Sequence, residues 1–238
     1  MSSSPSLRAR ETSALELMDD PDCDVVALDR TYRHFALVNR VVSGWRRIYE
    51  RRIRPLATAS PSPLTVLDIG SGGGDVARAL AAWSRRDGHP ISVTAIDPDP
   101  RAHAFALSLP SDDGVRYERT ASRALVEEGR VFDVVVSNHV LHHLAGAELT
   151  ALLDDSRVLA RRLAIHNDIA RSRTAYAAYS AATRVGFAGS FIRPDGLLSI
   201  RRSYTPAELR SRVGSEWRVE RLQPARLLLT LSPGGADA

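Results

Sequence analysis

The residues with the clearest chemistry lie in the run Val66-Leu67-Asp68-Ile69-Gly70-Ser71-Gly72-Gly73-Gly74-Asp75. Four of the five positions from 70 to 74 are glycine, more than a plain tight turn requires. Glycine leaves the backbone open to a ligand and tolerates positive φ. An acid, Asp68, stands two residues before the first glycine. The run therefore predicts a cofactor site on the glycine loop.

A second acid, Asp97, follows an apolar run in Ala95-Ile96-Asp97-Pro98-Asp99. A carboxylate in that place can accept hydrogen bonds from both hydroxyls of a ribose. The alternative, a cap on the following helix, fits Asp99 better than Asp97. NAD enzymes use the same ribose contact, but their fingerprint requires glycine or alanine where this chain has Asp75. We therefore expect a nucleoside cofactor and argue against an NAD oxidoreductase.

Histidines are concentrated in Ser137-Asn138-His139-Val140-Leu141-His142-His143-Leu144. Histidine exchanges protons near neutral pH, so His139 and His142 are the candidate catalytic residues, acting as a base or by positioning an acceptor. The alternative is that these histidines cap and pack a following helix. A divalent metal held by His139, His142, His143 and Asp168 is a further alternative, but ligand types without geometry are weak support. We predict no metal site.

Short apolar runs alternate with amphipathic stretches from residue 64 onward. This pattern predicts an α/β fold whose parallel sheet is covered on both faces. The last two runs are joined only by Gln223-Pro224-Ala225, too short for a parallel crossover, so they should form an antiparallel hairpin. Ligands of an open α/β sheet gather at the carboxyl ends of its strands, which would bring the acids and histidines together. We expect strands at 64–69, 91–96, 115–118, 132–137, 163–166, 217–222 and 226–231, and helices at 75–86, 100–107, 147–161 and 205–213.

Two further segments are expected to cover this site. Apolar residues from Phe35 to Tyr49 recur at helical spacing, which predicts an N-terminal helix over 30–53 that Pro55 ends. The long connection 169–202 contains four aromatic residues and is expected to form a lid over an apolar or aromatic acceptor. The expected organisation is a mobile tail at 1–28, a helical cap and linker at 29–61, and a cofactor-binding domain at 62–238.

Composition excludes several classes of protein. The chain of 238 residues suffices for one α/β domain with an N-terminal extension. Its single cysteine, Cys23, permits neither an internal disulfide nor a cysteine zinc site. The net charge of +4 is carried by scattered arginines, several of them beside acids, which does not favour nucleic acid as a partner. No run resembles a signal peptide or a membrane span, so a cytoplasmic enzyme is expected.

The glycine run resembles the motif of class I S-adenosylmethionine-dependent methyltransferases, an acid followed by G-x-G-x-G, with Gly70, Gly72 and Gly74 in the three places. The resemblance covers about residues 64–232. It implies a Rossmann-like seven-stranded, mostly parallel sheet with a C-terminal antiparallel hairpin. It also implies that Asp68 holds the methionine amino end of the cofactor, and that Thr120, Ala121 or Ser122 lies beside the adenine. The implied cofactor-binding residues are Asp68, Gly70, Ser71, Gly72, Gly74, Asp97, Pro98, Ser122, Ser137 and Asn138.

The segment from Ser137 to Leu144 resembles that of small-molecule methyltransferases, including the ubiquinone and menaquinone type. It differs from the Asn-Pro-Pro-Tyr segment that holds an exocyclic amine in DNA or glutamine methyltransferases. The resemblance implies methylation of a small aromatic, quinone-like or polyketide-like acceptor, at oxygen rather than carbon or nitrogen, as in secondary metabolism. The alternatives are an RNA methyltransferase and a cofactor-binding partner without catalysis. The sequence leaves the acceptor and the oligomeric state open, and also whether the N-terminal helix caps its own pocket.

Overall fold

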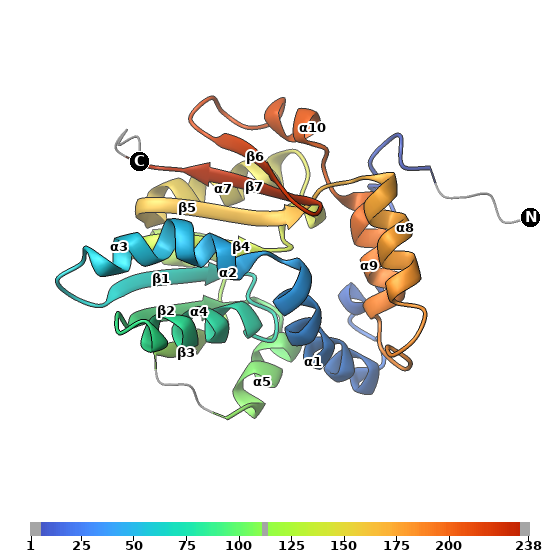
Figure 1. Ribbon diagram of the computed structural model, residues 1–238, viewed down its shortest axis with the longest axis horizontal. Helices are drawn as coiled ribbons and strands as arrows, with labels where there is room; N and C mark the ends of the chain where they lie inside the picture. Colours follow the sequence, from blue (N-terminus) through green and yellow to red (C-terminus); the bar gives the residue numbers. More distant parts are fainter. Residues whose placement is uncertain (1–5, 111–113, 234–238) are drawn as a thin grey trace, which may run out of the picture.

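The computed structural model describes residues 6–110 and 114–233. Its centre is a seven-stranded sheet in the order β3-β2-β1-β4-β5-β7-β6, in which β7 alone runs antiparallel to both of its neighbours (Figure 1). The sheet is parallel from β3 to β5. The strands are β1 (Leu64–Ile69), β2 (Ile91–Ile96), β3 (Val115–Glu118), β4 (Phe132–Asn138), β5 (Ala160–Ile169), β6 (Arg218–Leu222) and β7 (Arg226–Leu231).

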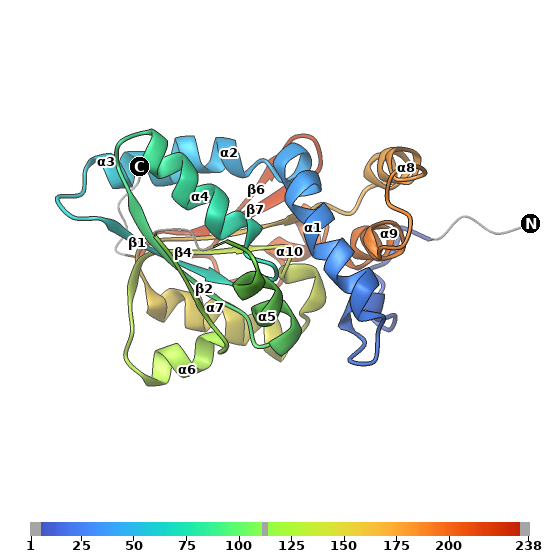
Figure 2. The same cartoon turned by 90° about the horizontal axis from the view of Figure 1, so that it is seen from below.

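Helices cover both faces of the sheet, and each face has its own apolar core (Figure 2). One core contains α4 (Asp75–Arg86), α2 (Trp45–Ile48), the π-helical turn Tyr49–Ile53 and α3 (Arg54–Thr58). The other contains α6 (Ser122–Glu127), α7 (Ala147–Leu159) and α10 (Pro206–Arg210). The central strands β1 and β4 have side chains in both cores, which explains their nearly continuous apolar sequences.

Another set of helices, separate from those on the two faces of the sheet, lies beyond the carboxyl ends of the parallel strands (Figure 1). It consists of α1 (Val25–Val42), α8 (Arg173–Ala182), α9 (Ile192–Arg202) and the short 3₁₀ helix Leu17–Asp19, with α5 (Pro100–Ser108) packing beside α1. These elements cover the edge of the sheet where the acids and histidines emerge. The N-terminal helix thus caps the pocket of its own chain.

The predicted fold class is confirmed, including the antiparallel C-terminal hairpin. Several boundaries were wrong. β5 begins at Ala160 and ends at Ile169, longer at both ends than predicted, and α7 accordingly stops at Leu159. The helix predicted at 205–213 is the shorter α10, which opens with a capping box between Thr205 and Glu208.

The predicted N-terminal helix over 30–53 is divided into several elements. Helix α1 starts at Val25, because the Asp24 side chain caps it, and ends at Val42. Gly44, with φ of 72°, separates it from α2. Pro55 does not end the helical region: it lies in the first turn of α3, where a missing N–H leaves no hydrogen bond unmade.

Residues 1–28 were expected to form a mobile tail, of which residues 1–5 lie outside the described residues. Residues 6–24 do not extend away from the domain, and 25–28 belong to α1. The Arg10 guanidinium donates to the carbonyl oxygens of His142, Leu144 and Arg202 at 2.5–2.8 Å. Glu16 is only 4% exposed. We call residues 6–24, which run across α9, the N-terminal strap.

Candidate cofactor and acceptor site

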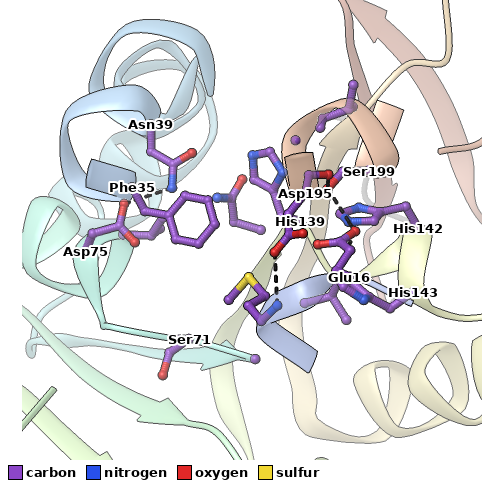
Figure 3. Close-up of a pocket in the computed structure, with 18 of the residues that line it drawn as sticks. Glu16, Phe35, Asn39, Ser71, Asp75, His139, His142, His143, Asp195 and Ser199 are labelled. Carbon is purple, nitrogen blue, oxygen red and sulfur yellow. Dashed lines mark hydrogen bonds and ion pairs between the residues drawn. The ribbon is translucent and has the colours of Figure 1, made fainter. Parts of the chain in front are cut away.

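A cavity of about 970 Å³ lies at the carboxyl edge of the sheet, between the strand ends and the covering elements (Figure 3). Its floor is the glycine loop after β1 and the segments after β2 and β4. Its other walls are α1, the N-terminal strap, α8 and α9. Of the residues predicted for the site, those that line the cavity are Asp68, Gly70, Ser71, Gly72, Asp97, Pro98, Ser122, Asn138, His139 and His142.

The glycine loop joins the first two strand ends through backbone contacts. The amides of Gly70 and Ser71 donate to the Ile96 carbonyl oxygen at 2.9 and 3.0 Å. The Gly72 amide donates to Oδ2 of Asp97 at 2.8 Å. Gly70 has φ of 67°, and a Cβ atom there would lie 2.7 Å from Cγ2 of Val140. Glycine is therefore required at position 70 both by conformation and by the close approach of the segment after β4.

Two predicted cofactor residues do not line the cavity. Gly74 caps the N-terminus of α4, and a Cβ atom there would lie 2.5 Å from the Tyr117 ring, so its glycine serves helix–strand packing. Ser137 is fully buried behind the cavity, and its hydroxyl lies 2.8 Å from Nδ1 of His166. The alternation of side chains along β4 turns Ser137 away from the cavity while Asn138 faces it.

Three carboxyl groups gather around the cofactor end of the cavity: Asp68, Asp75 and Asp97. Burial raises the pKa of all three, and the charges of Asp75 and Asp97 raise that of Asp68 further. Oδ2 of Asp68 is buried without a hydrogen-bond partner among the described residues. Asp75 accepts a hydrogen bond from Asn39 of α1 at 3.0 Å (Figure 3). A buried acidic cluster with an unpaired oxygen fits a cationic cofactor, whose charge would compensate these carboxylates.

Ser122 lies at the far end of this region with Thr120 and Ala121. The Ser122 hydroxyl donates to Oδ2 of Asp155 at 2.8 Å. The three residues expected beside the adenine thus all line the cavity. Their contact with adenine stays a prediction.

His142 lies between two carboxylates. Its Nδ1 is 2.8 Å from Oδ1 of Asp168, and its Nε2 is 3.3 Å from Oε1 of Glu16. Burial alone would lower the pKa of His142, but the two carboxylates overcome that effect and raise it to about 9. His142 is therefore a buried imidazolium at neutral pH, so it cannot take a proton from an acceptor there.

His139 has the opposite environment. Burial and the nearby charge of Arg226 hold its pKa well below the ordinary range, so the ring is neutral. Its Nε2 lies 3.1 Å from Nη1 of Arg226. The backbone of His139 has φ of 61°, a conformation that a non-glycine residue rarely adopts and that often marks a functional site. The His139 amide donates to the Asn167 carbonyl oxygen at 3.0 Å, which holds the residue in that conformation.

Sequence reasoning missed four residues of the site: Glu16, Asn39, Asp195 and Arg226. Glu16 and Asp195 belong to segments far from the sheet motifs, and Arg226 is one of many arginines. Asp195 accepts the backbone amides of Leu17 and Met18 at 2.8 and 3.0 Å, which fastens the N-terminal strap to α9. Of these four residues, only Asn39 could have been predicted from the sequence, because it lies one helical turn after Phe35 on the same face of the predicted helix.

The residues of the metal alternative do converge. Donor atoms of His139, His142 and Asp168 lie within 4.8 Å of one another, and so do those of Glu16, His142 and His143. Ion pairs between the His142 imidazolium and its two carboxylates account for this arrangement without a metal ion. A metal at this place stays an untested alternative.

The fold, the acid-and-glycine loop and the acidic cofactor end define a class I S-adenosylmethionine-dependent methyltransferase. Residues 42–172 match the family model of a methyltransferase domain, and the chain belongs to that family. Its cofactor is S-adenosylmethionine, as expected from Asp68 and the glycines.

Curated relatives match parts of the chain. The chain is 29% identical to the ubiquinone biosynthesis O-methyltransferase of Methylobacterium sp. (strain 4-46) over 147 residues, which is 59% of this chain and 55% of that protein. It is 38% identical to the protein of that name from Roseobacter denitrificans over 93 residues, 37% of this chain and 35% of that protein. The chain thus matches about half or less of the length of these relatives.

Solved structures share the fold over nearly the whole chain. The plantazolicin methyltransferase BpumL in complex with SAH superposes with a TM-score of 0.63 at 13% identity, covering 91% of this chain and 92% of that one. Magnesium protoporphyrin IX methyltransferase from Synechocystis PCC 6803 with bound SAM has a TM-score of 0.56 at 16% identity, covering 94% and 100%. Within the described part of this chain, no helix is both long and apolar enough to cross a membrane.

Proposed function

We propose that this chain transfers a methyl group to an oxygen atom of a small aromatic acceptor of the quinol or polyketide-phenol type. The observation that carries the proposal is the continuity of one cavity from the acidic cofactor end to an apolar end. Phe35 projects into the space between the two ends (Figure 3). The apolar end is lined by side chains suited to a flat ring: Val38, Val42, Ile169, Ala175, Ala178 and Ile192.

When bound, S-adenosylmethionine supplies a methyl group on a positively charged sulfur, a reagent that is already activated. The protein must then align the acceptor and exclude water. We assign Asp97 to the ribose, because it already accepts the Gly72 amide at the tip of the loop. We assign Asp68 to the amino end of the cofactor, because its buried Oδ2 has no hydrogen-bond partner among the described residues and can accept one from an ammonium group.

The two histidines take different roles in this proposal. His142, protonated between Glu16 and Asp168, positions the strap and the segment after β4. His139, neutral and at the cavity wall, is the histidine that contacts the acceptor. Glu16 closes the cavity from the strap, so that the reacting centre is kept from solvent.

Isothermal titration with S-adenosylmethionine, S-adenosylhomocysteine and NAD tests the cofactor assignment. We expect both sulfur compounds to bind and NAD not to bind. Asp97→Ala should weaken cofactor binding about 10- to 100-fold, since the charged Asp97 carboxylate would no longer accept hydrogen bonds from the ribose. Asp154→Ala, which removes an exposed acid of α7, is the matched control and should bind like the unaltered protein.

A screen of small phenols and quinols for methyl transfer then tests the acceptor assignment, with the methylated atom identified by mass spectrometry and NMR. Transfer to nitrogen or carbon, or to an RNA substrate, would contradict the proposal. Binding of NAD in place of both sulfur compounds would contradict the assignment of the glycine loop itself.

A further inference from the structure

Arg226, the first residue of β7, lines the cavity although only 3% of the residue is exposed. Its guanidinium reaches the ends of the two neighbouring parallel strands, β5 and β4. Nε donates to Oδ1 of Asn167 at 3.2 Å, and Nη2 donates to Oδ1 of Asn138 at 3.0 Å. Nη1 lies 3.1 Å from Nε2 of His139. All three partners are neutral.

No carboxylate lies within ion-pairing distance of Arg226 in the part of the chain that the structure describes. Arg171, another buried arginine, differs in this respect because its Nη2 contacts the Glu208 carboxylate. Burial lowers the pKa of Arg226 to about 10 although the charge of Asp168 raises it, so the group remains a cation near neutral pH. Because its hydrogen-bond partners are neutral, the guanidinium keeps its charge available to an anionic ligand in the cavity.

The charged groups nearest to Arg226 are already paired with one another. Asp168 contacts Nδ1 of His142, and Glu16 faces Nε2 of the same ring while also accepting a hydrogen bond from Ser199. These carboxylates therefore flank His142. Three of the five guanidinium N–H groups of Arg226 have acceptors, which leaves two for a ligand.

His139 offers a second donor. Because its Nε2 faces an N–H group of Arg226 and its ring is neutral, Nε2 accepts and Nδ1 carries the proton. A histidine in this tautomer donates a hydrogen bond through Nδ1. Its Nε2 is not free to act as a base while the contact with Arg226 lasts.

We infer that Arg226 and His139 form an anion-binding subsite that holds the acceptor through a negatively charged oxygen, a phenolate or a carboxylate. The inference rests on the proposed function and specifies the chemical class of its acceptor. It complements the cofactor end, where Asp68, Asp75 and Asp97 suit a cation. Within this cavity, the acidic residues then lie at the end that holds the cofactor sulfonium, and Arg226 lies beside the acceptor oxygen.

Such a subsite removes the need for a base at the moment of transfer. An opposite charge within hydrogen-bonding reach lowers the pKa of a bound acid by about 1–3 units. A phenol held by Arg226 would therefore lose its proton to solvent before the reaction. The acceptor oxygen then forms its bond to the methyl carbon while the methyl–sulfur bond breaks, and the electron pair of that bond stays on the sulfur.

The test uses 4-nitrophenol, whose phenolate absorbs visible light and whose neutral form does not. The protein is saturated with S-adenosylhomocysteine, and the absorbance of the bound probe is followed against pH. We expect the pKa of bound 4-nitrophenol to fall by about one unit or more relative to the free probe. Arg226→Gln should abolish the shift, and Arg226→Lys should retain part of it because the charge remains.

Arg171→Gln is the matched control, since it alters a buried arginine that does not line the cavity. It should leave the shift unchanged. Benzoate distinguishes a carboxylate subsite from a phenolate subsite. A carboxylate subsite would bind benzoate about tenfold more weakly in Arg226→Gln than in the unaltered protein, while bound 4-nitrophenol would show no pKa shift. Both results would support an anion-binding subsite.

An unshifted or raised pKa of nitrophenol in the unaltered protein, with benzoate binding independent of Arg226, would overturn the inference. Failure of both probes to bind would also overturn it. If Arg226→Gln loses S-adenosylhomocysteine binding and Arg171→Gln does not, the guanidinium serves the cofactor and the inference is wrong. If the proposed function itself is wrong, the unaltered protein will fail to bind S-adenosylhomocysteine, and this is seen before any probe is added.

Discussion

Oε1 of Glu16 lies 3.3 Å from Nε2 of His142, so the N-terminal strap reaches the interior of the methyltransferase domain. Asp168 at the end of β5 holds the other nitrogen of the same ring at 2.8 Å. The buried imidazolium of His142 thus joins the N-terminal strap, the segment after β4 and the end of β5. This ion triad links closure of the cavity to the protonation of a single histidine.

The first prediction concerns the pH dependence of stability. The pKa of His142 rises from 6.5 in the unfolded chain to about 9 in the folded protein. Its contribution to stability is therefore fully present below pH 6.5 and is lost as the pH rises through 9, because only the folded state keeps the proton in that window. The full effect is about 3 kcal/mol. Thermal unfolding of the unaltered protein and of His142→Gln should show a gap that narrows from pH 6 to pH 9.5.

His89→Gln is the control for this comparison, because His89 lies in the turn after α4, away from the cavity. Its difference from the unaltered protein should not change with pH over the same range. A gap for His142→Gln that stays constant or widens with pH would show that the ring is neutral in the folded protein.

The second prediction concerns attachment of the strap. The carboxylate of Asp195 accepts two backbone amides, from Leu17 and Met18, and an amide side chain has only one oxygen to offer. Asp195→Asn should therefore raise the rate of tryptic cleavage after Arg10 about tenfold, equivalent to one lost hydrogen bond. Mass spectrometry of the early fragments measures this rate. Asp154→Asn on α7 is the control, and equal rates for both variants would refute the role of Asp195.

Asp195 should also make attachment of the strap depend on pH. Burial raises the pKa of Asp195 to about 6, above the 3.8 of an exposed carboxyl group. The attached state therefore binds the proton more tightly than a detached state would, so attachment is strengthened as the pH falls through 6. Cleavage after Arg10 by a protease active over this range should slow below pH 6 in the unaltered protein and change less in Asp195→Asn.

The third prediction separates backbone strain from crowding at two glycines. Gly74 and Gly88 have nearly the same φ, 74° and 76°, but a Cβ atom on Gly74 would meet the Tyr117 ring at 2.5 Å while Gly88 has open space. Gly88→Ala should cost about 1 kcal/mol of folding free energy, from strain alone. Gly74→Ala should cost about 1–3 kcal/mol more. Chemical denaturation measures both, and equal costs would mean that Tyr117 moves freely away.

The sequence was sufficient to predict the sheet, because most strands are short apolar runs bounded by turn residues. The edge strands β3 and β6 instead alternate apolar with charged residues, which is also a local pattern. The sequence also located the cofactor loop, since Asp68 and the glycines are local signals. Glu16 and Arg226 could not be found in this way. Their roles depend on ion pairs and hydrogen bonds between segments far apart in the chain, which no local pattern encodes. Ser137 was predicted to bind the cofactor, but side chains alternate along β4, so that of Ser137 points away from the cavity and that of Asn138 points into it.

The last prediction concerns the two histidines together. His139→Ala combined with His142→Ala removes a donor at the cavity wall and the cation that positions the strap. Turnover with the true acceptor should fall about 100-fold, because both changes disturb the position of the acceptor. The affinity for S-adenosylhomocysteine should stay within about threefold, because Asp68 and Asp97 bind the cofactor elsewhere in the cavity.

The single variants separate the two roles. His139→Gln keeps a hydrogen-bond donor and should recover part of the rate, whereas His139→Ala should not. His142→Gln should mainly raise the KM for the acceptor, because its effect passes through the strap. His89→Ala, after α4 and outside the cavity, is the control for both. If the double variant keeps full turnover, neither histidine takes part in the reaction, and the acceptor must be held by Arg226 and the apolar wall alone.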